Sequence, residues 1–184
     1  ARGSRGVSAA RGKAVRPAEH TNRLVAPRPV GCAILTVSDT RRGDDDRSGA
    51  RMHELLERAG HMVTRRAWVR DERRAIRATA AALLRRRDTD VVLVTGGTGM
   101  APRDVTPEAL EPLRQKSLAG FGHRFGGRSV RQVGEAAWCS RAEAGVAKGR
   151  LLVMLPGSTA AVELALKEVL LPELVHAVRT LGRF

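Results

Sequence analysis

The stretch VGCAILTVSDTRRGDDDRSGARMHELLERAG at residues 30–60 decides the fold class, because its hydrophobic period changes along its length. Residues 30–37 form a continuous apolar run with β-branched members, a pattern typical of a strand buried on both faces. A polar loop follows at 38–49, and Ser48 is placed to cap a helix that Gly60 ends. The apolar residues of this helix recur at helical spacing, at Met52, Leu55, Leu56 and Ala59. The segment therefore predicts the first half of a βαβ unit.

The same order of elements continues downstream. Loose alternation at 61–69 predicts a second strand, and Asp71 stands where the N-cap of the next helix is expected. The apolar positions of that helix are Ile76, Ala80, Leu83 and Leu84. DVVLVT (90–95) predicts a third strand. Thr106-Pro107-Glu108 then combines an N-cap, a proline at the first helical position and a first-turn acid, which together indicate a helix start.

The last third of the chain is less regular. Residues 114–150 carry several glycines and short apolar patches and predict no more than one or two short helices. LLVML (151–155) predicts a buried strand, after which Ser158 can cap a helix. The apolar face of that helix is formed by Val162, Ala165, Leu166, Val169 and Leu170. Pro172 ends this helix or begins a final one that runs through Leu181.

Strands that alternate with helices predict an α/β fold, here a three-layer α/β/α sandwich with a mainly parallel sheet. One domain is expected over residues 28–184. Residues 1–27 show no sustained period and are rich in Arg, Gly, Ser, Ala and Pro, so a flexible basic arm is expected there. A targeting peptide, a polyanion-binding tail and a misassigned start remain alternatives for this arm. Because ligands bind beyond the carboxyl ends of such strands, the loops after them are the candidate site.

The composition argues against several classes of protein and site. No apolar run approaches the roughly 18–20 residues that a membrane span needs. Cys32 and Cys139 lie far apart without metal-ligand spacing, so two reduced, partly buried thiols in a cytosolic protein are expected. The five histidines form no paired metal motif. The net charge is +14, and residues 1–30 account for only part of it, so the folded region should also attract anions. The chain has no Tyr and few other aromatics, which argues against a platform that stacks on single-stranded nucleic acid.

The strongest local feature is TGGTGMAPRDVTPEA at 95–109. Gly96, Gly97 and Gly99 allow a sharp turn that brings backbone N–H groups close to an anion. The stretch lacks the Lys-Ser/Thr of a P-loop and the spacing of a dinucleotide fingerprint. Asp104 lies just ahead of the helix start, where it either stabilises the turn or takes part in chemistry.

Three other loops follow predicted strands. Residues 38–49 supply hydroxyls and carboxylates, which alone indicate a solvated acidic turn with a helix cap. Asp71 alone indicates an N-cap, and Pro156-Gly157-Ser158 forms either a turn and cap or a phosphate-binding helix entry. The arginines at 85–87 suit a solvated cluster at a helix end. The joint placement of these loops after four strands favours a binding site.

Several segments together resemble the molybdopterin adenylyltransferase family of the MogA/MoaB type. They are ILTVSDT, Asp46-Arg47-Ser48-Gly49, TGGTGMAPRDVTPEAL, SRAEAGV (140–146) and LPGSTAAV. The similarity runs in order over roughly residues 30–181. The loop after the third strand is closer to this type than to the related domains of molybdenum insertases or competence-damage proteins.

The resemblance implies adenylylation of molybdopterin, in which the terminal phosphate of the pterin attacks the α-phosphorus of ATP and pyrophosphate leaves. Asp71 and Asp104 match the two important aspartates of the family, which implies that they organise Mg²⁺ or the transition state. Gly96, Gly97, Thr98 and Gly99 would cradle phosphate through backbone N–H groups. The remaining residues implied to bind pterin or nucleotide are Ser38, Asp39, Ser48, Thr95, Arg103, Thr106, Pro156, Gly157 and Ser158. A cytoplasmic homotrimer or hexamer with a downstream molybdenum insertase is also implied.

One departure leaves an alternative open. The family commonly has Gly-Phe-Gly-Glu where this chain has Gly120-Phe121-Gly122-His123, so a permanently anionic side chain is replaced by a histidine. A pterin-binding carrier of the MoaB type that does not adenylylate its ligand is therefore the second hypothesis. A third, suggested by the charge and the basic arm, is a protein that associates with nucleic acid. DNA or RNA binding that depends only on residues 1–27 and falls steeply with salt would reflect counterion release, not a specific function.

Overall fold

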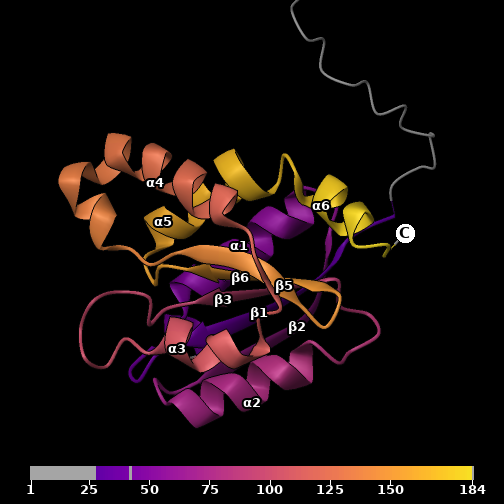
Figure 1. The fold of residues 1–184 in the computed structure, drawn as a ribbon, viewed down its shortest axis with the longest axis horizontal. Coiled ribbons are helices and arrows are strands. Elements are labelled where there is room, and N and C mark those ends of the chain that lie inside the picture. Colours follow the sequence, from indigo (N-terminus) through magenta and orange to yellow (C-terminus); the bar gives the residue numbers. More distant parts are fainter. Residues whose placement is uncertain (1–27, 42, 184) are drawn as a thin grey trace, which may run out of the picture.

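The computed structural model describes residues 28–41 and 43–183, apart from the side chains of residues 135 and 136. The arm predicted at 1–27 lies outside these residues. A six-stranded sheet forms the centre of the fold, in the order β2-β1-β3-β6-β5-β4 (Figure 1). In that order, the strands are Met62–Val69, Gly31–Val37, Val91–Thr95, Arg150–Leu155, Glu143–Ala147 and Lys116–Ser117. The first four strands are parallel, whereas β5 is antiparallel to β6 and β4 to β5.

Helices cover both faces of the sheet, which confirms the predicted α/β sandwich (Figure 1). One face carries α1 (Arg47–Arg58), α4 (Ala119–Val133), α5 (Thr159–Leu164) and α6 (Leu174–Thr180). A π-helical stretch at Ala165–Leu170 continues α5. The other face carries α2 (Arg73–Leu83) and α3 (Thr106–Leu110). Short 3-10 turns lie at Gly43–Asp45, Glu111–Leu113 and Gly134–Cys139.

Alternate residues of the central strands fill two separate cores. Along β1, Cys32 and Ile34 pack beneath α1, whereas Ala33 and Leu35 pack against the α2 side. Every residue of β1 and β3 is buried, as the continuous apolar runs predicted. Removing these side chains from water on both faces of the sheet supplies the main driving force for folding.

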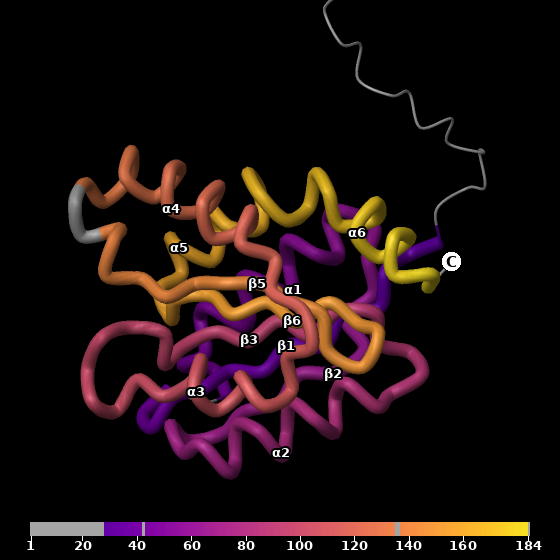
Figure 2. Tube along the Cα trace, viewed as in Figure 1, coloured from indigo at the N-terminus to yellow at the C-terminus, as the bar shows by residue number. Residues whose placement is uncertain are grey.

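From β1 the chain runs to β2 at one edge of the sheet, and from β3 it runs to β4 at the opposite edge, so the sheet has a switch point between β1 and β3. At such a point two adjacent loops diverge beyond the carboxyl ends of the strands and leave a crevice. Figure 2 shows that the loop after β3 projects beyond the sheet at the same end as the segment that leads into β5. The backbone N–H of Arg141 in that segment donates to the Thr98 carbonyl at 3.1 Å.

Three helix caps differ from the sequence-based expectation. Asp46, not Ser48, caps α1, because its carboxylate accepts a hydrogen bond from the Gly49 N–H at 2.8 Å. Glu72 holds the N-cap position of α2 and Val105 that of α3, where Asp71 and Thr106 were expected. Boundary shifts of one or two residues are common in sequence-based assignment. Here they release the expected capping side chains for contacts in the candidate site. Ser158, by contrast, caps α5 as predicted.

Residues 114–150 hold more regular secondary structure than the sequence predicts. They hold the 15-residue helix α4, the longest described helix, and the strands β4 and β5. Four glycines within α4 hide the helical signal, because glycine is a poor helix former. The β5 strand, EAGVA, is too short and too rich in small residues to show a clear β pattern.

None of the helices in the described residues is long and apolar enough to cross a membrane. Cys32 and Cys139 are both free, the first buried and the second half-buried. Burial, with a smaller contribution from the Asp90 charge, raises the pKa of the Cys32 thiol to about 12.

Asp90, just before β3, binds residues near both ends of the described chain at the amino-terminal ends of the strands. Its buried carboxylate accepts hydrogen bonds from Arg28, from the Gly31 N–H and from Arg183, at 2.9 to 3.1 Å. Burial by itself raises the pKa of Asp90, but the bonds from Arg28, Gly31 and Arg183 outweigh it and bring the pKa below its ordinary value. The carboxylate therefore stabilises the fold above the unfolded-state pKa of about 4.

We expect Asp90→Asn to lower the free energy of unfolding at pH 7 by about 2 kcal/mol, because a buried, charge-assisted acceptor is weakened. The difference from the unsubstituted protein should shrink as the pH falls below roughly 4, where protonation removes the same charge. Urea unfolding at pH 7 and at pH 3.5 measures both. Asp88→Asn is the matched control, because this half-exposed neighbour pairs with Arg86 and should contribute less than about 0.5 kcal/mol. Equal losses in the two variants would contradict the role of Asp90.

Candidate functional site

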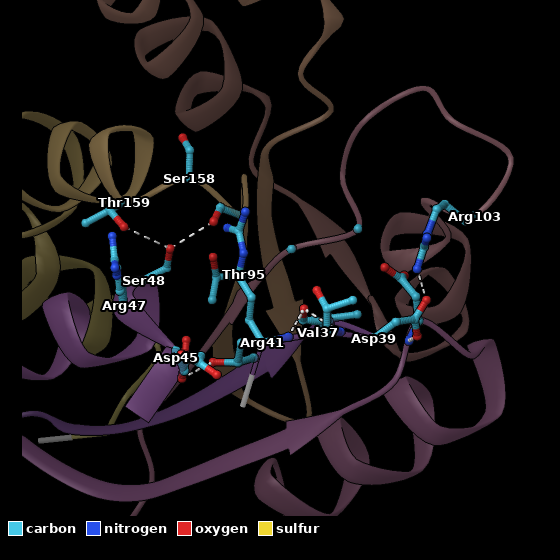
Figure 3. Close-up of a pocket in the computed structure, with 18 residues that line it drawn as sticks. Val37, Asp39, Arg41, Asp45, Arg47, Ser48, Thr95, Arg103, Ser158 and Thr159 are labelled. Atoms are coloured by element: carbon cyan, nitrogen blue, oxygen red, sulfur yellow. Dashed lines mark hydrogen bonds and ion pairs between the residues drawn. The ribbon is translucent and has the colours of Figure 1, made fainter. Parts of the chain in front are cut away.

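A cavity of about 820 Å³ opens at the carboxyl ends of β1 and β3, where the switch point predicts a ligand. Its walls come from the ends of β1 and β3 and from the loops after β1, β2, β3 and β6, so the predicted convergence of these loops is observed (Figure 3). Hydroxyls, carboxylates and guanidinium groups dominate the lining. A polar cleft of this size suits a charged, phosphorylated small molecule better than an apolar one.

One end of the cavity is rich in charged groups and hydroxyls. Arg41, Arg47 and Asp45 lie there with the hydroxyls of Ser48 and Thr159 (Figure 3). The Ser48 hydroxyl donates to the Gly157 carbonyl at 2.8 Å, which ties α1 to the loop after β6. It also lies 3.4 Å from the Thr159 hydroxyl. Cationic side chains next to a capped helix entry make this end suitable for phosphate oxygens.

The opposite end is built around Asp39, which joins three loops. One carboxylate oxygen accepts a hydrogen bond from the Asp71 N–H at 3.1 Å. The other forms an ion pair with Arg103, which reaches across from the loop after β3 (Figure 3). Both oxygens of Asp39 are thus engaged within the protein. The residue holds the three loops together in addition to lining the cavity.

The glycine turn after β3 is packed directly against the end of β1. Gly96 and Gly97 adopt positive φ values of 102° and 63°. A Cβ at Gly96 would lie 2.1 Å from the Val37 carbonyl oxygen, and one at Gly97 would lie 2.6 Å from Asp71 Oδ1. Only glycine fits both positions. The Gly96 N–H donates to the Leu155 carbonyl at 3.0 Å, so this group, expected to face a phosphate, is already bonded.

Hydroxyl groups brace the same turn from beneath. Thr95 donates to the Pro156 carbonyl at 2.8 Å, and Thr106 donates to the Gly96 carbonyl at the same distance. Both threonine side chains are buried. They therefore fix the backbone of the turn, and Thr106 does so instead of capping α3.

Asp71 and Asp104 both lie against the glycine turn: a Cβ at Gly97 would be 2.6 Å from Asp71 Oδ1, and one at Gly99 would be 2.6 Å from Asp104 Oδ2. Burial raises the pKa of Asp71, the negative charge of Asp104 raises it further, and a hydrogen bond from the Val105 backbone partly offsets both. Asp71 Oδ1 is buried and has no hydrogen-bond partner within the described part of the chain. Asp104 Oδ2 accepts from the Ala101 N–H at 3.0 Å. Two neighbouring carboxylates, one with an unsatisfied oxygen, form an arrangement that a hard divalent cation would stabilise.

Asp104 lines a second, smaller cavity of about 340 Å³ on the far side of the turn. Its other lining residues are Arg73, Met100, Ala101, Pro102, Val105, Glu108 and Arg141. The two aspartates therefore open into different cavities, with the glycine turn between them.

The structure brings most of the predicted site residues to the larger cavity. Those that line it are Ser38, Asp39, Ser48, Asp71, Thr95, Gly96, Gly97, Arg103, Gly157 and Ser158. Those that do not are Thr98, Gly99, Asp104, Thr106 and Pro156. Thr98 and Thr106 are buried under the turn. His123 is exposed on α4 and lines neither cavity.

Sequence reasoning missed eight residues of the larger cavity: Thr36, Val37, Thr40, Arg41, Asp45, Asp46, Arg47 and Thr159. Five of them, Thr40, Arg41, Asp45, Asp46 and Arg47, belong to the predicted loop at 38–49, whose composition alone indicates an acidic turn. Arg41 and Arg47 were the available signal, because that loop directly follows a predicted strand. Asp46 is buried and caps α1. Its carboxylate also accepts hydrogen bonds from the Thr36 hydroxyl at 2.8 Å and from the Arg66 guanidinium at 3.1 Å, an arrangement with no sequence signature.

Comparisons with known proteins agree on one family. Residues 33–176 match the family described as "Probable molybdopterin binding domain". The chain is 45% identical over 159 residues to molybdenum cofactor biosynthesis protein B of Halalkalibacterium halodurans, covering 86% of this chain and 94% of that protein. A crystal structure of a molybdenum cofactor biosynthesis protein B is similar at a TM-score of 0.83 and 42% identity, covering 87% of this chain and all of that one. The molybdopterin biosynthesis enzyme MoaB of Thermus thermophilus is similar at 0.74 and 32%, with 83% and 96% covered.

We expect Gly96→Ala to lower the free energy of unfolding by about 2 to 3 kcal/mol, because a side chain there is strained at this φ and collides with the Val37 carbonyl. Gly127→Ala is the matched control. A Cβ at this exposed α4 position would meet nothing within 4 Å, and alanine favours the helix, so a gain of about 0.5 to 1 kcal/mol is expected. Thermal or urea unfolding compares the two. A Gly96→Ala protein as stable as the unsubstituted one would disprove the close approach of the two loops.

Proposed function

This chain belongs to the molybdopterin-binding family of molybdenum cofactor biosynthesis proteins, and from that premise we propose that it adenylylates molybdopterin with ATP. The observation that carries the proposal is the Asp71–Asp104 pair beside a glycine turn that itself lines a polar cavity large enough for a phosphorylated pterin. Phosphoryl and nucleotidyl transfer depend on positioning and charge neutralisation more than on a protein nucleophile. The site offers both.

The proposed reaction joins two phosphorylated substrates. An oxygen of the pterin's terminal phosphate attacks the α-phosphorus of ATP and forms a new P–O bond. The bond from the α-phosphorus to the bridging oxygen breaks, and pyrophosphate leaves with the electron pair. Arg41 and Arg47 offset the negative charge that accumulates when the two polyanions meet. Ser48 and Ser158, at the two helix entries that face the cavity, contribute hydroxyl contacts to the phosphorylated ligand.

The residues present suit Mg²⁺. The unsatisfied Oδ1 of Asp71 and the carboxylate of Asp104 would hold the ion, with phosphate and water oxygens completing its shell. No cluster of three or more His, Cys, Asp or Glu side chains occurs in the described residues, a pattern that suits an ion shared with the nucleotide. When bound, Mg²⁺ supplies positive charge that offsets the phosphates. Asp71 also holds its own loop in place, through its N–H and Asp39.

Assembly into a homotrimer or a hexamer forms part of the proposal. Val130 and Val133 near the end of α4 and Trp138 in the turn after it are exposed, and Trp138 is 78% exposed. Large exposed apolar side chains within a short segment favour contact with another protein surface. The adenylylated pterin would then pass to a molybdenum insertase in the cytoplasm.

A second candidate function is that of a pterin carrier without transferase activity. His123 favours it, because the resemblance places an acid at this position, and the relatives reported above include proteins named for cofactor biosynthesis without a stated reaction. A carrier needs only the larger cavity, whereas an adenylyltransferase also needs the aspartate pair.

We expect Asp104→Asn and Asp71→Asn each to lower the rate of adenylylation by about 10²- to 10³-fold, because each removes a charge that organises the transition state. Pyrophosphate release and formation of adenylylated pterin from molybdopterin and Mg-ATP measure the rate. Molybdopterin affinity and melting temperature should stay close to those of the unsubstituted protein, since asparagine keeps the acceptor for the Ala101 N–H. Full activity in both variants would rule out this assignment of roles.

His123→Glu distinguishes the two candidate functions. If the chain is an adenylyltransferase, the unsubstituted protein turns over and the variant changes the rate by less than about tenfold, because residue 123 lines neither cavity. If it is a carrier, the unsubstituted protein binds molybdopterin without forming product. Activity that appears only in His123→Glu would identify residue 123 as the cause of the lost chemistry.

A further inference from the structure

Arg141 stands in the SRAEAGV segment just ahead of β5, and the proposed reaction gives this residue no role. Its side chain nevertheless points at the loop that carries Asp104. Arg141 Nε donates to the Gly99 carbonyl at 3.0 Å, and Nη2 donates to the Asp104 carbonyl at 2.7 Å. Nη1 forms an ion pair with Glu108 in the first turn of α3. The backbone N–H of Arg141 also donates to the Thr98 carbonyl, so this residue bonds to both ends of the loop.

The loop has few other attachments to the body of the protein. Met100 is 62% exposed, and residues 101–103 are also exposed, so hydrophobic burial does not fix this segment. Within the loop, the Asp104 N–H donates to the Ala101 carbonyl at 2.8 Å and the Asp104 carboxylate accepts from the Ala101 N–H. These bonds shape the turn but do not fix its position relative to the rest of the protein. The Arg103–Asp39 ion pair and the bonds from Arg141 connect the loop to other segments.

Guanidinium geometry explains why arginine suits this position. Its planar fork presents donors in fixed directions, so it can bridge two carbonyls and a carboxylate at the same time. Lysine has the same charge but a single compact ammonium on a flexible stem, and it cannot reproduce the three directions. The link spans a large separation in sequence, 42 residues from Gly99 and 37 from Asp104.

We infer that Arg141 is a positioning residue that fixes the loop between Thr98 and Asp104 and thereby sets Asp104 opposite Asp71. This inference rests on the proposed function for its catalytic consequence, but not for its structural one. Asp71 comes from the loop after β2, so the spacing of the aspartate pair depends on how the loop after β3 is held. A loosened loop separates the carboxylates but affects the larger cavity only through Arg103, because the rest of that cavity's lining lies outside residues 98–104.

Arg141→Lys tests the inference, with Arg150→Lys as the matched control. The Arg150 guanidinium also donates hydrogen bonds to backbone carbonyls, those of Thr89, Lys148 and Arg86. These contacts lie at the opposite end of the sheet from the site. Both substitutions remove comparable contacts. Hydrogen–deuterium exchange of residues 98–105 should be roughly tenfold faster in Arg141→Lys and unchanged in Arg150→Lys.

Mn²⁺ affinity, measured by electron paramagnetic resonance without nucleotide, provides the second readout. We expect it to fall about tenfold or more in Arg141→Lys, the usual effect of losing a residue that orients metal ligands, and to be unchanged in Arg150→Lys. The adenylylation kcat should fall with it, while the molybdopterin Kd changes less, because Arg103 is the one residue of the 98–104 loop that lines the larger cavity.

Unchanged exchange at 98–105 in Arg141→Lys would overturn the inference whatever the activity. Faster exchange with unchanged Mn²⁺ affinity, or without any measurable Mn²⁺ binding in the unsubstituted protein, would also overturn it, since the loop would then not serve the aspartate pair. An unsubstituted protein that binds Mn²⁺ but forms no adenylylated pterin would refute the proposed function alone. In that case the exchange and Mn²⁺ results still decide the role of Arg141.

Discussion

The site depends on how closely the loops beyond three neighbouring strands approach one another around Gly96. A Cβ there would lie 2.1 Å from the carbonyl oxygen at the end of β1, and one at Gly157 would lie 3.3 Å from the Gly96 Cα. Backbone therefore packs on backbone at the carboxyl end of the sheet. Because nothing larger than glycine fits, the hydroxyls after β1 and β6 and the carboxylate after β2 are all brought to one cavity.

This packing also brings opposite charges together at the site. Arg41 and Arg47 share one end of the cavity with Asp45, and Arg103 pairs with Asp39 at the other end. In the proposed function, the arginines contact phosphate oxygens and the two aspartates beside the glycine turn hold a cation. The raised pKa of Asp71 reflects its burial and the repulsion from Asp104.

Sequence patterns predicted the α/β architecture and the edge of the sheet that holds the site, because a buried strand followed by a polar loop is a local signal. They located Asp71, Gly96 and Gly97 but not the roles of Ser48 and Thr106, which donate to the carbonyls of Gly157 and Gly96 instead of capping helices. Helix α4 was missed since its glycines resemble loop residues. Contacts between distant segments, such as that of Arg141 with the loop after β3, have no local signature at all.

The two aspartates differ in how they are held. Asp71 comes two residues after β2, and its backbone N–H donates to Asp39. Asp104 lies in a loop whose position depends on polar side chains from elsewhere in the fold. Arg141 does not line the larger cavity, and Arg103 is the one residue of the 98–104 loop that does, so a change at Arg141 acts first on Asp104. The proposed transferase and the proposed carrier therefore differ in what they require of this loop: a carrier needs the larger cavity, whereas a transferase also needs Asp104 held near Asp71.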